Sequence, residues 1–527
     1  MEHKRYFKDG FHLFDHQVPS AKALCQRRRA LLVDGTGSGK TLTCLYAFSY
    51  LQSRGVVTNL LVWTPLNAYT KRIWEKDAEK YSYLKCISFD DYIAQRSRGV
   101  SVESLLSRYD VIYGKHGHCK TSFQWLQELY KAAPRSVTCI DEVHKMSNPK
   151  TELVSTFKPL LARAYALWGI TATLLSKNVI NVYNLVNLIY PKYFRSYKFF
   201  LEEFCKVEER VIGKNFDGTL KKARLVTDYK DPEKLKAYLS SVMITGVPPV
   251  DAHIHMVDYV MGDRERALYE KISKGLLAES QDDESWLDAV LSGTLTGGSV
   301  VPSVKSLDRH SSRFIYLQSV VDGSLDESGR FGTYGSAKCD ALVALCRDIA
   351  AKGQSALIYC DYYTSVDMVL HALRQSGIKD NRGHSIMVME SSSRKQLSES
   401  ALSESVCAYH SCFCVITRAT SESANYPFIS NVIFYSVPVV PVAYAQAAGR
   451  ICRRNSKYLG DLHVWILRSD NIDTYKLVLV GFKIYMMKEA AVDFQNFPQE
   501  YVKSLSGAAQ LTAAKRHLLW GAYRSKK

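Results

Sequence analysis

Residues 30–41, which read Ala-Leu-Leu-Val-Asp-Gly-Thr-Gly-Ser-Gly-Lys-Thr, are the stretch that decides the fold of this chain. The first four residues are apolar and predict a short buried strand, and the glycine-rich turn leads into an apolar helical run from Leu42 to Leu51. A strand, a glycine-rich loop and a helix in this order form the context that a phosphate-binding loop requires. The stretch therefore predicts an α/β domain with a nucleotide site at the end of a strand.

The loop carries groups suited to nucleotide phosphates. Its glycines allow successive backbone N–H groups to turn toward one anion, and the helix that follows adds its positive N-terminal end. Lys40 is expected to reach the β- and γ-phosphates of ATP, and the Thr41 hydroxyl is expected to bind Mg²⁺. The alternative is an ordinary glycine turn, which the closing Gly-Lys-Thr disfavours; Asp34 departs from the strict pattern, which has glycine there. The loop residues expected to contact ATP are Gly35, Thr36, Gly37, Ser38, Gly39, Lys40 and Thr41.

Gln17 lies shortly upstream of the loop. Because an amide side chain both donates and accepts hydrogen bonds, Gln17 is a candidate for reading adenine. An ordinary surface glutamine is the equally weighted alternative.

An acidic pair follows another apolar run. Ser136–Ile140 predicts a buried strand, and Asp141 and Glu142 come directly after it. Carboxylates at the end of a buried strand are costly unless they hold a cation or water. Asp141 is expected to hold Mg²⁺ through water, and Glu142 to orient and deprotonate the attacking water. The alternative is a helix that begins with acidic residues.

Apolar runs alternate with helical patterns through the first 200 residues. Strands are predicted at 59–63, 110–113 and 165–170 in addition to the two above. This alternation predicts βα units and a parallel sheet, with ligands beyond the carboxyl ends of the strands.

A second α/β unit is predicted from about residue 337, with strands at 356–359, 413–416 and 432–435. A helix is then expected to begin near Gln446, which would place Gln446, Gly449, Arg450 and Arg453 on one face. Arginines presented in this way are suited to neutralising charge on a γ-phosphate. An ordinary basic helix face is the alternative.

In chain order, Asp34–Thr41, Thr64-Pro65, Asp141–His144 and Thr171-Ala-Thr173 resemble motifs I, Ia, II and III of superfamily-2 helicases. Asp141-Glu-Val-His-Lys-Met-Ser-Asn-Pro149 is similar to the second motif of the Swi/Snf branch, and Asp34 is also usual in that branch. Gln446-Ala-Ala-Gly-Arg-Ile-Cys-Arg453 resembles motif VI. A faint similarity of residues 488–494 to poxvirus-type phosphohydrolases makes a viral or phage source conceivable.

The resemblance implies ATP and Mg²⁺ as cofactors and a role for each motif. Gln446 would contact ATP, Arg450 and Arg453 would act in catalysis with Lys40, Asp141 and Glu142, and Thr171 and Thr173 would couple hydrolysis to motion. The residues 421–425, at the place of motif V, lack its usual glycines. Nucleic-acid contacts are expected from Thr64, Lys115, His116 and Thr417.

The implied fold class is α/β, with two RecA-like parallel-sheet domains, a helical insertion and a helical C-terminal extension. The expected boundaries are residues 1–206 for RecA-like ATP-binding domain 1, 207–335 for the helical insertion and linker, 336–470 for RecA-like domain 2 and 471–527 for the helical extension.

Composition narrows the partners. The chain has 527 residues and a net charge of +17, which favours polyanions, nucleic acid first. Its 13 cysteines include no C-x-x-C pair, and no secretory signal or membrane-spanning apolar run is visible, so we expect an intracellular protein.

The leading functional hypothesis is an ATP-dependent helicase or translocase on duplex or branched DNA. An RNA-directed helicase or NTPase in viral transcription and a nucleotide-binding scaffold that does not translocate are the alternatives.

Overall fold

The structure is a computed structural model that describes residues 6–172, 174, 180–214, 220–246, 250–280, 310–392, 397, 399–409, 411–417, 426–454, 456–490, 494 and 496–503. The chain divides into two compact units. The first comprises Met1–Phe204, Asp231–Pro249 and Met487–Asp493, and the second comprises Cys205–Lys230, Val250–Met486 and Phe494–Lys527.

The first unit is built on a seven-stranded sheet whose order is β3-β4-β2-β5-β6-β1-β9. Every pair of neighbouring strands is parallel. The strands are β1 (Arg29–Val33), β2 (Leu60–Thr64), β3 (Cys86–Ser88), β4 (Val111–Lys115), β5 (Val137–Asp141), β6 (Ala166–Thr171) and β9 (Met243–Ile244). Because both faces of a parallel sheet are covered, its strands are continuous apolar runs. The five strands predicted in this part of the chain are present.

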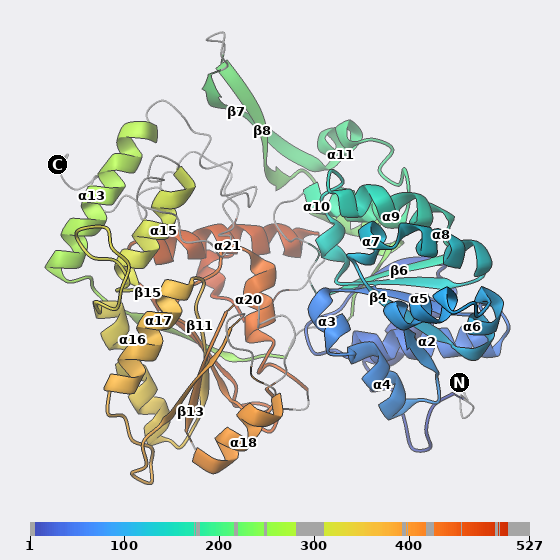
Figure 1. Cartoon of the computed structure of the whole chain (residues 1–527). Helices are drawn as coiled ribbons and strands as arrows, with labels where there is room; N and C mark the ends of the chain where they lie inside the picture. The colour runs from blue at the N-terminus through green and yellow to red at the C-terminus, as the bar shows by residue number, and fades with distance from the viewer. Residues whose placement is uncertain are drawn as a thin grey trace. The chain divides into compact units, whose positions relative to one another are not determined.

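Helices cover both faces of this sheet (Figure 1). Leu45 and Phe48 of α2 and Trp74 of α4 pack in one apolar core with strand residues such as Leu32 and Val62. The helical segments are α1 (Gln17–Gln26), α2 (Lys40–Ser53), α3 (Leu66–Thr70), α4 (Ile73–Tyr81), α5 (Phe89–Ser97), α6 (Val102–Arg108), α7 (His118–Thr121), α8 (Phe123–Ala132), η1 (Val143–Met146), α9 (Glu152–Arg163), α10 (Ile180–Ile189), α11 (Tyr197–Phe204) and α12 (Pro232–Ser240).

The second unit contains a six-stranded sheet with the order β10-β15-β14-β11-β13-β12. All its neighbouring strands are parallel. The strands are β10 (His253–Asp258), β11 (Ala356–Tyr359), β12 (Met387–Ser391), β13 (Cys412–Ile416), β14 (Asn431–Phe434) and β15 (His463–Arg468). Two parallel α/β sheets in one chain confirm the predicted fold class, a tandem of RecA-like domains.

Helices α16 and α17 pack against the sheet of the second unit through Leu342, Ile349, Val366 and Val369. On α20, the ring of Tyr444 stacks on Phe434 of β14 with centroids 4.3 Å apart. The helical segments of this unit are α13 (Asp263–Ser280), α15 (His310–Val321), α16 (Ala337–Ala351), α17 (Tyr363–Gln375), α18 (Glu399–Tyr409), α20 (Pro441–Ala448), η3 (Gln499–Tyr501) and α21 (Ile472–Glu489) as far as Met486.

A buried ionic network connects several elements of the second unit. The Lys338 ammonium lies 2.9 Å from carboxylate oxygens of Asp322 and Asp473, and all three side chains are fully buried. The Ser365 hydroxyl donates to Asp322, and the Tyr259 hydroxyl donates to Asp473, both at 2.6 Å. Asp322, within the stretch predicted as insertion and linker, is thus buried in the core of this unit.

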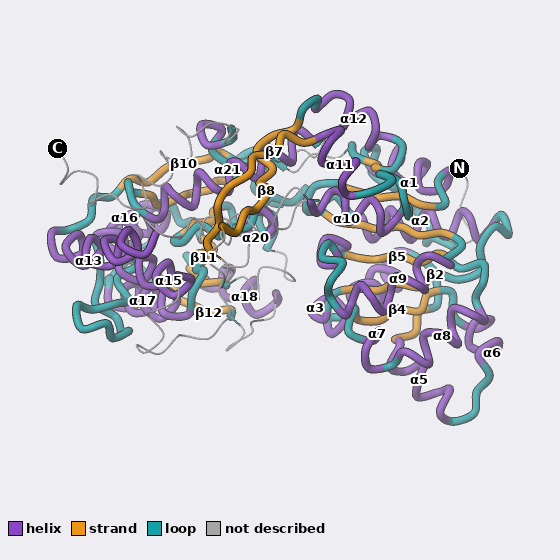
Figure 2. Tube along the Cα trace, turned by 90° about the horizontal axis from the view of Figure 1, so that it is seen from above, coloured by secondary structure: helices purple, strands orange, loops and turns teal. Residues whose placement is uncertain are grey.

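The stretch 207–335 was predicted as helical, and it also contains strands. β7 (Cys205–Lys214) and β8 (Leu220–Tyr229) form a two-stranded antiparallel ribbon, visible in Figure 2. β9 and β10 are edge strands of the two parallel sheets. The two-residue β9 is too short for a period to show in the sequence, and β10 carries histidines in place of apolar residues.

Among the described helices, none is long and apolar enough to cross a membrane. Of the expected helical C-terminal extension, residues 504–527 lie outside the described residues.

Candidate nucleotide site

The phosphate-binding loop joins β1 to α2 and ends in a left-handed glycine. Gly39 has φ +79° and immediately precedes α2, which begins at Lys40. A Cβ atom on Gly39 would lie 2.3 Å from Nε2 of Gln17. The left-handed backbone angle strongly favours glycine, and a Cβ would in addition displace the Gln17 amide. The loop therefore turns sharply enough to leave the N-terminal N–H groups of α2 for an anion.

Gln17 and His16 hold the loop from α1 and the residue before it. Gln17 Nε2 donates to the carbonyls of Ser38 and Gly39, both at 3.1 Å, and Gln17 Oε1 accepts from the Phe14 N–H at 3.0 Å. A ring nitrogen of His16 is also hydrogen-bonded to the Ser38 carbonyl. Gln17 is thus engaged with the loop backbone, and its reading of adenine stays a prediction.

Lys40 lies over the loop that precedes it. Its ammonium donates to the carbonyls of Asp34 and Gly35, each at 2.9 Å. Asp34 is buried and accepts a hydrogen bond from the Ser20 hydroxyl at 3.1 Å. The residue that replaces the usual first glycine therefore ties the loop to α1.

Asp141 ends β5, and two donors meet one of its oxygens. The Thr64 hydroxyl at the end of β2 donates to Asp141 Oδ2 at 2.8 Å, and the Trp74 indole of α4 donates to the same atom at 3.1 Å. Burial, reinforced by the charge of Glu142, raises the pKa of Asp141 against the lowering effect of these bonds and of Lys40. Asp141 Oδ1 makes no hydrogen bond to any residue the structure describes.

Glu142 has a strained backbone and a tightly held carboxylate. Its φ of 49° and ψ of 50° lie in the left-handed region, which costs a non-glycine residue energy. Its Oε2 lies 3.1 Å from His144 Nδ1 and accepts from the Thr171 hydroxyl at 3.3 Å. Burial would raise the pKa of Glu142, but the bond and charge of His144, followed by Lys40 and Lys145, outweigh it and lower the pKa to about 2.

Thr171 also contacts His144 directly, with 2.9 Å between its hydroxyl and the His144 Nδ1. Thr171, the predicted coupling residue at the end of β6, is therefore bonded both to His144 and to Glu142. The second predicted coupling residue, Thr173, lies outside the described residues.

Of the residues predicted to contact nucleic acid in the first unit, Thr64 and His116 are buried. Thr64 is occupied with Asp141, and the His116 ring Nε2 is 3.1 Å from the Trp63 carbonyl and 3.0 Å from the Asp141 carbonyl. Burial, followed by the charge of Lys145, lowers the pKa of His116 to about 4, so the ring is neutral and Nε2–H donates. The Lys115 ammonium lies 5.8 Å from the Tyr69 ring centroid. Their contacts with nucleic acid remain predictions.

The donor set of this unit fits a magnesium–nucleotide complex. Mg²⁺ is usually held by one or two carboxylates together with waters and substrate phosphates. Asp141 Oδ1 supplies such a carboxylate oxygen, and the Thr41 hydroxyl has no hydrogen bond to a described residue. Ser38 Oγ is buried and has no partner among the residues described either. The described residues contain no cluster of three or more histidine, cysteine or acidic side chains for a metal bound by protein alone.

The prediction that Gln446, Gly449, Arg450 and Arg453 share one face of a helix is wrong. α20 begins at Pro441 and ends at Ala448, so Gln446 lies in its last turn and the arginines lie beyond it. Gly449 weakens the helix there, and the N–H groups of Arg450 and Ile451 bond three residues back instead of four. Arg450 is buried, and its Nε donates to the Gln446 carbonyl at 3.1 Å, closing the helix end.

Arg453 is half-buried, and Thr417 is buried at the end of β13. Residues 418–425, where the glycines of motif V were missing, lie outside the described residues. The roles of Gln446, Arg450, Arg453 and Thr417 remain predictions.

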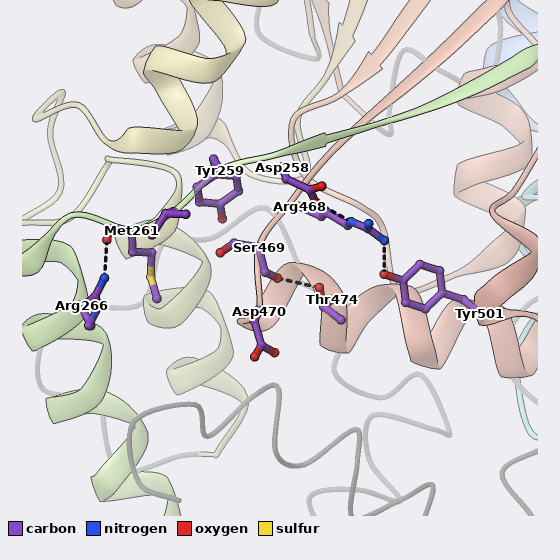
Figure 3. Close-up of a pocket in the computed structure, with 10 residues that line it drawn as sticks. Asp258, Tyr259, Met261, Arg266, Arg468, Ser469, Asp470, Thr474 and Tyr501 are labelled. Carbon is purple, nitrogen blue, oxygen red and sulfur yellow. Dashed lines mark hydrogen bonds and ion pairs between the residues drawn. The ribbon is translucent and has the colours of Figure 1, made fainter. Parts of the chain in front are cut away.

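A separate pocket of about 370 Å³ lies beyond the carboxyl ends of β10 and β15 (Figure 3). Arg468 lines it, donating to Asp258 at 2.7 Å and to the Tyr501 hydroxyl at 2.6 Å. Beside it, the Thr474 hydroxyl donates to the Ser469 carbonyl. The Arg468 guanidinium therefore connects Asp258 and Tyr501, two residues that line this pocket.

The fold and the loop–acid arrangement are those of a superfamily-2 helicase/ATPase. More particularly, the chain belongs to the SNF2-related family: the SNF2-related domain matches residues 16–295, more than half of the chain, and the helicase conserved C-terminal domain matches residues 337–455. The protein is thus an ATP-dependent helicase/ATPase, and ATP is the nucleotide that the family implies.

Relatives come from several kingdoms. The chain is 23% identical over 495 residues to the "Uncharacterized ATP-dependent helicase YqhH" of Bacillus subtilis, covering 90% of this chain and 78% of that protein. It is 27% identical over 255 residues to the human "Chromodomain-helicase-DNA-binding protein 6", covering 44% of this chain but only 9% of that protein. The bacterial and human relatives give no support to a viral or phage source.

A solved structure, the "Sulfolobus solfataricus SWI2/SNF2 ATPase core in complex with dsDNA", is 17% identical and aligns over 93% of this chain and 95% of its own, with a TM-score of 0.38. The family assignment rests on the domain matches rather than on this superposition.

Two partners of the acidic pair were missed from the sequence. Trp74 was not among the predicted site residues, and His144 stood only inside the stretch Asp141–Pro149 without a role of its own. Trp74 lies 67 residues from Asp141, so only folding brings the two together, whereas His144 lies two residues after Glu142. The available signal was a tryptophan on a helix whose other residues are mostly charged, because a tryptophan that becomes buried needs an acceptor for its indole N–H.

Proposed function

We propose that the protein is an ATP-driven translocase or helicase that moves on duplex or branched DNA. The observation that carries the proposal is the assembly around the acidic pair. Asp141 is held by Thr64 and Trp74, and Glu142 by His144 and Thr171, at the ends of neighbouring strands beside the phosphate loop. The matches to the SNF2-related domain and to the helicase conserved C-terminal domain also support ATP-driven movement.

ATP binding falls to the loop. The N–H groups at the start of α2 would bind the phosphates, and the Lys40 ammonium would leave the Asp34 and Gly35 carbonyls to bind the β- and γ-phosphates. Thr41 and Asp141 would hold Mg²⁺. Bound there, Mg²⁺ supplies positive charge to the phosphates.

Glu142 serves as the group that orients water and accepts its proton. The low pKa of Glu142, about 2, keeps it ionised at neutral pH, and the bonds from His144 and Thr171 fix its carboxylate. Thr171 ends β6, so a shift of that strand end would move Glu142. This is the link by which hydrolysis would be coupled to motion.

The arginines act from the second unit. Arg450 and Arg453 would neutralise charge that develops on the γ-phosphate, which makes hydrolysis depend on closure of the two units around ATP. We assign ATP binding to residues 1–206 and the arginines to residues 336–470, joined by 207–335 and followed by the extension 471–527.

The substrate is inferred from charge and from relatives. A net charge of +17 favours a polyanion, and the human relative is named as DNA-binding. Contacts should go to the phosphate backbone, because a motor must be indifferent to sequence, and affinity should fall steeply with salt. Remodelling of DNA inside the cell during replication, recombination or repair is the role that follows.

The test compares ATP hydrolysis in the presence of duplex DNA, single-stranded DNA and RNA of equal length. Duplex DNA is expected to stimulate most. Preference for RNA would replace DNA as the substrate, and absence of hydrolysis with every polynucleotide would replace the motor by a nucleotide-binding scaffold.

A further inference from the structure

The indole of Trp74 is placed unusually for a buried tryptophan. Trp74 is fully buried in α4, and its N–H donates to Oδ2 of Asp141 at 3.1 Å. Thr64 donates to the same oxygen at 2.8 Å. One carboxylate oxygen thus receives two donors, while Oδ1 receives none from the described part of the chain.

Two buried indoles on strands of the same unit show that burial alone does not require a carboxylate. Trp63 donates to the hydroxyl of Tyr130 at 3.0 Å, and Trp168 donates to the carbonyl of Arg27 at 3.3 Å. A buried N–H needs an acceptor, and a neutral one suffices. The bond from Trp74 is charge-assisted, so it is stronger and more directional than the other two.

The start of α4 is fixed in place around Trp74. Arg72 has a left-handed backbone with φ 53° and its Nε donates to Glu75 at 2.6 Å. Glu75 is also bonded to the hydroxyl of Tyr113 on β4. These contacts hold the first turn of α4 against the sheet, and the indole between them has a defined position.

We propose that Trp74 is a positioning residue that fixes the Asp141 carboxylate, with Oδ2 taken and Oδ1 left for Mg²⁺ or its water, and so sets the magnesium affinity of the nucleotide site. This inference rests on the proposed function of Asp141. Outer partners of metal-binding groups typically contribute 10- to 100-fold in metal affinity. Trp74 differs from the residues the motifs identify because it belongs to no phosphate-loop or acidic motif.

The experiment measures binding of a fluorescent ADP to the full-length protein as Mg²⁺ is titrated, and again in EDTA. In Trp74→Phe, the Mg²⁺ concentration for half-maximal tightening should rise about tenfold, while binding in EDTA stays at the wild-type level. Thr64→Val removes the other donor and should produce a shift of the same kind. Trp168→Phe removes a buried indole N–H that does not reach Asp141, and it is the matched control.

A second variant separates the N–H from the ring. Replacement of Trp74 by benzothienylalanine keeps the bicyclic shape and substitutes sulfur for the N–H, so packing in the core is kept. The proposal requires this variant to show the same magnesium shift as Trp74→Phe. A wild-type magnesium midpoint in the benzothienylalanine variant would overturn it, even if Trp74→Phe fails to fold.

The outcome for Trp74 is distinguishable from failure of the proposed function. If wild-type ADP binding does not depend on Mg²⁺, the function assigned to Asp141 fails and the proposal falls with it. If ADP binding to the wild type and to Trp168→Phe depends on Mg²⁺ and both Trp74 variants show the wild-type magnesium midpoint, only the role of Trp74 fails.

Discussion

Replacement of Lys338 by methionine should destabilise the second unit strongly. Lys338 is the one cation bonded to both Asp322 and Asp473 in the described core, and all three side chains are fully buried. Methionine keeps most of the aliphatic volume, so the change removes charge and hydrogen bonds with little loss of packing. Two carboxylates would then remain in the core without their counter-ion.

The size of the effect follows from those contacts. Breaking a buried ion pair by removing one partner costs about 3–5 kcal/mol, since it leaves an uncompensated buried charge. With about 4 kcal/mol lost and a urea m-value of about 3 kcal/mol/M, the unfolding midpoint of this unit should fall by about 1.3 M. Burial would lower the pKa of Lys338, but the two carboxylates raise it above 10.5; the stabilisation is therefore fully present below pH 10.5 and is lost as pH rises through the folded-state pKa.

Hydrogen exchange in increasing urea measures this unit separately. Peptides from α16, α17 and β13 should lose protection at lower urea in Lys338→Met, and peptides from β1 and β5 in the first unit should not. Lys352→Met, at an exposed position in the same unit, is the control. Equal midpoints in Lys338→Met and Lys352→Met would refute the reasoning.

Three further predictions concern the first unit. Lys40→Ala should abolish ATP binding measured by equilibrium titration, because the ammonium is the loop's only side-chain cation for the phosphates, and retained affinity would contradict this. Glu142→Gln should bind ATP normally but turn over at least roughly 10²-fold more slowly, as expected when a general base is lost; a quench-flow rate near the wild type would exclude Glu142 as that base. Burial raises the pKa of Cys25 to about 11, so about 10⁻³ of the thiol is ionised at pH 8; mass spectrometry should find it alkylated slowly in the native protein and quickly in urea, and rapid native alkylation would contradict the burial.

The buried parallel strands could be predicted closely from the sequence. A strand covered on both faces must be apolar throughout, so residues 30–33 and 136–140 were recognisable as strands. The first run lies within β1 (Arg29–Val33), and the second overlaps β5 (Val137–Asp141). The place of Asp322 could not be predicted in this way. Its segment looks like a polar loop, and only Lys338 and Asp473, 16 and 151 positions further along the chain, make its burial possible.

Helix ends depend on local bonds that a periodic pattern does not contain. The spacing of Gln446 and Arg450 fitted one helix face, yet α20 stops at Ala448, where Gly449 follows and the Arg450 guanidinium bonds to the helix end. Gly449 was visible in the sequence, but the bond from the Arg450 guanidinium to the Gln446 carbonyl forms only in the folded chain.

In the site, residues adjacent along the chain were recognisable and distant partners were not. Lys40, Asp141 and Glu142 stand in motifs whose spacing reflects one loop or one strand end. Trp74 reaches Asp141 only because α4 packs over the neighbouring strand end. Such partners depend on how elements pack, which the sequence does not encode at any fixed spacing.

The most direct test of the central claim is single-turnover hydrolysis of ATP bound to Arg453→Ala, with duplex DNA present. If the second unit completes the site, this variant should bind ATP as the wild type does and hydrolyse it roughly 10³-fold or more slowly. Near-normal hydrolysis would contradict the claim that arginines beyond α20 act on the nucleotide held by Lys40.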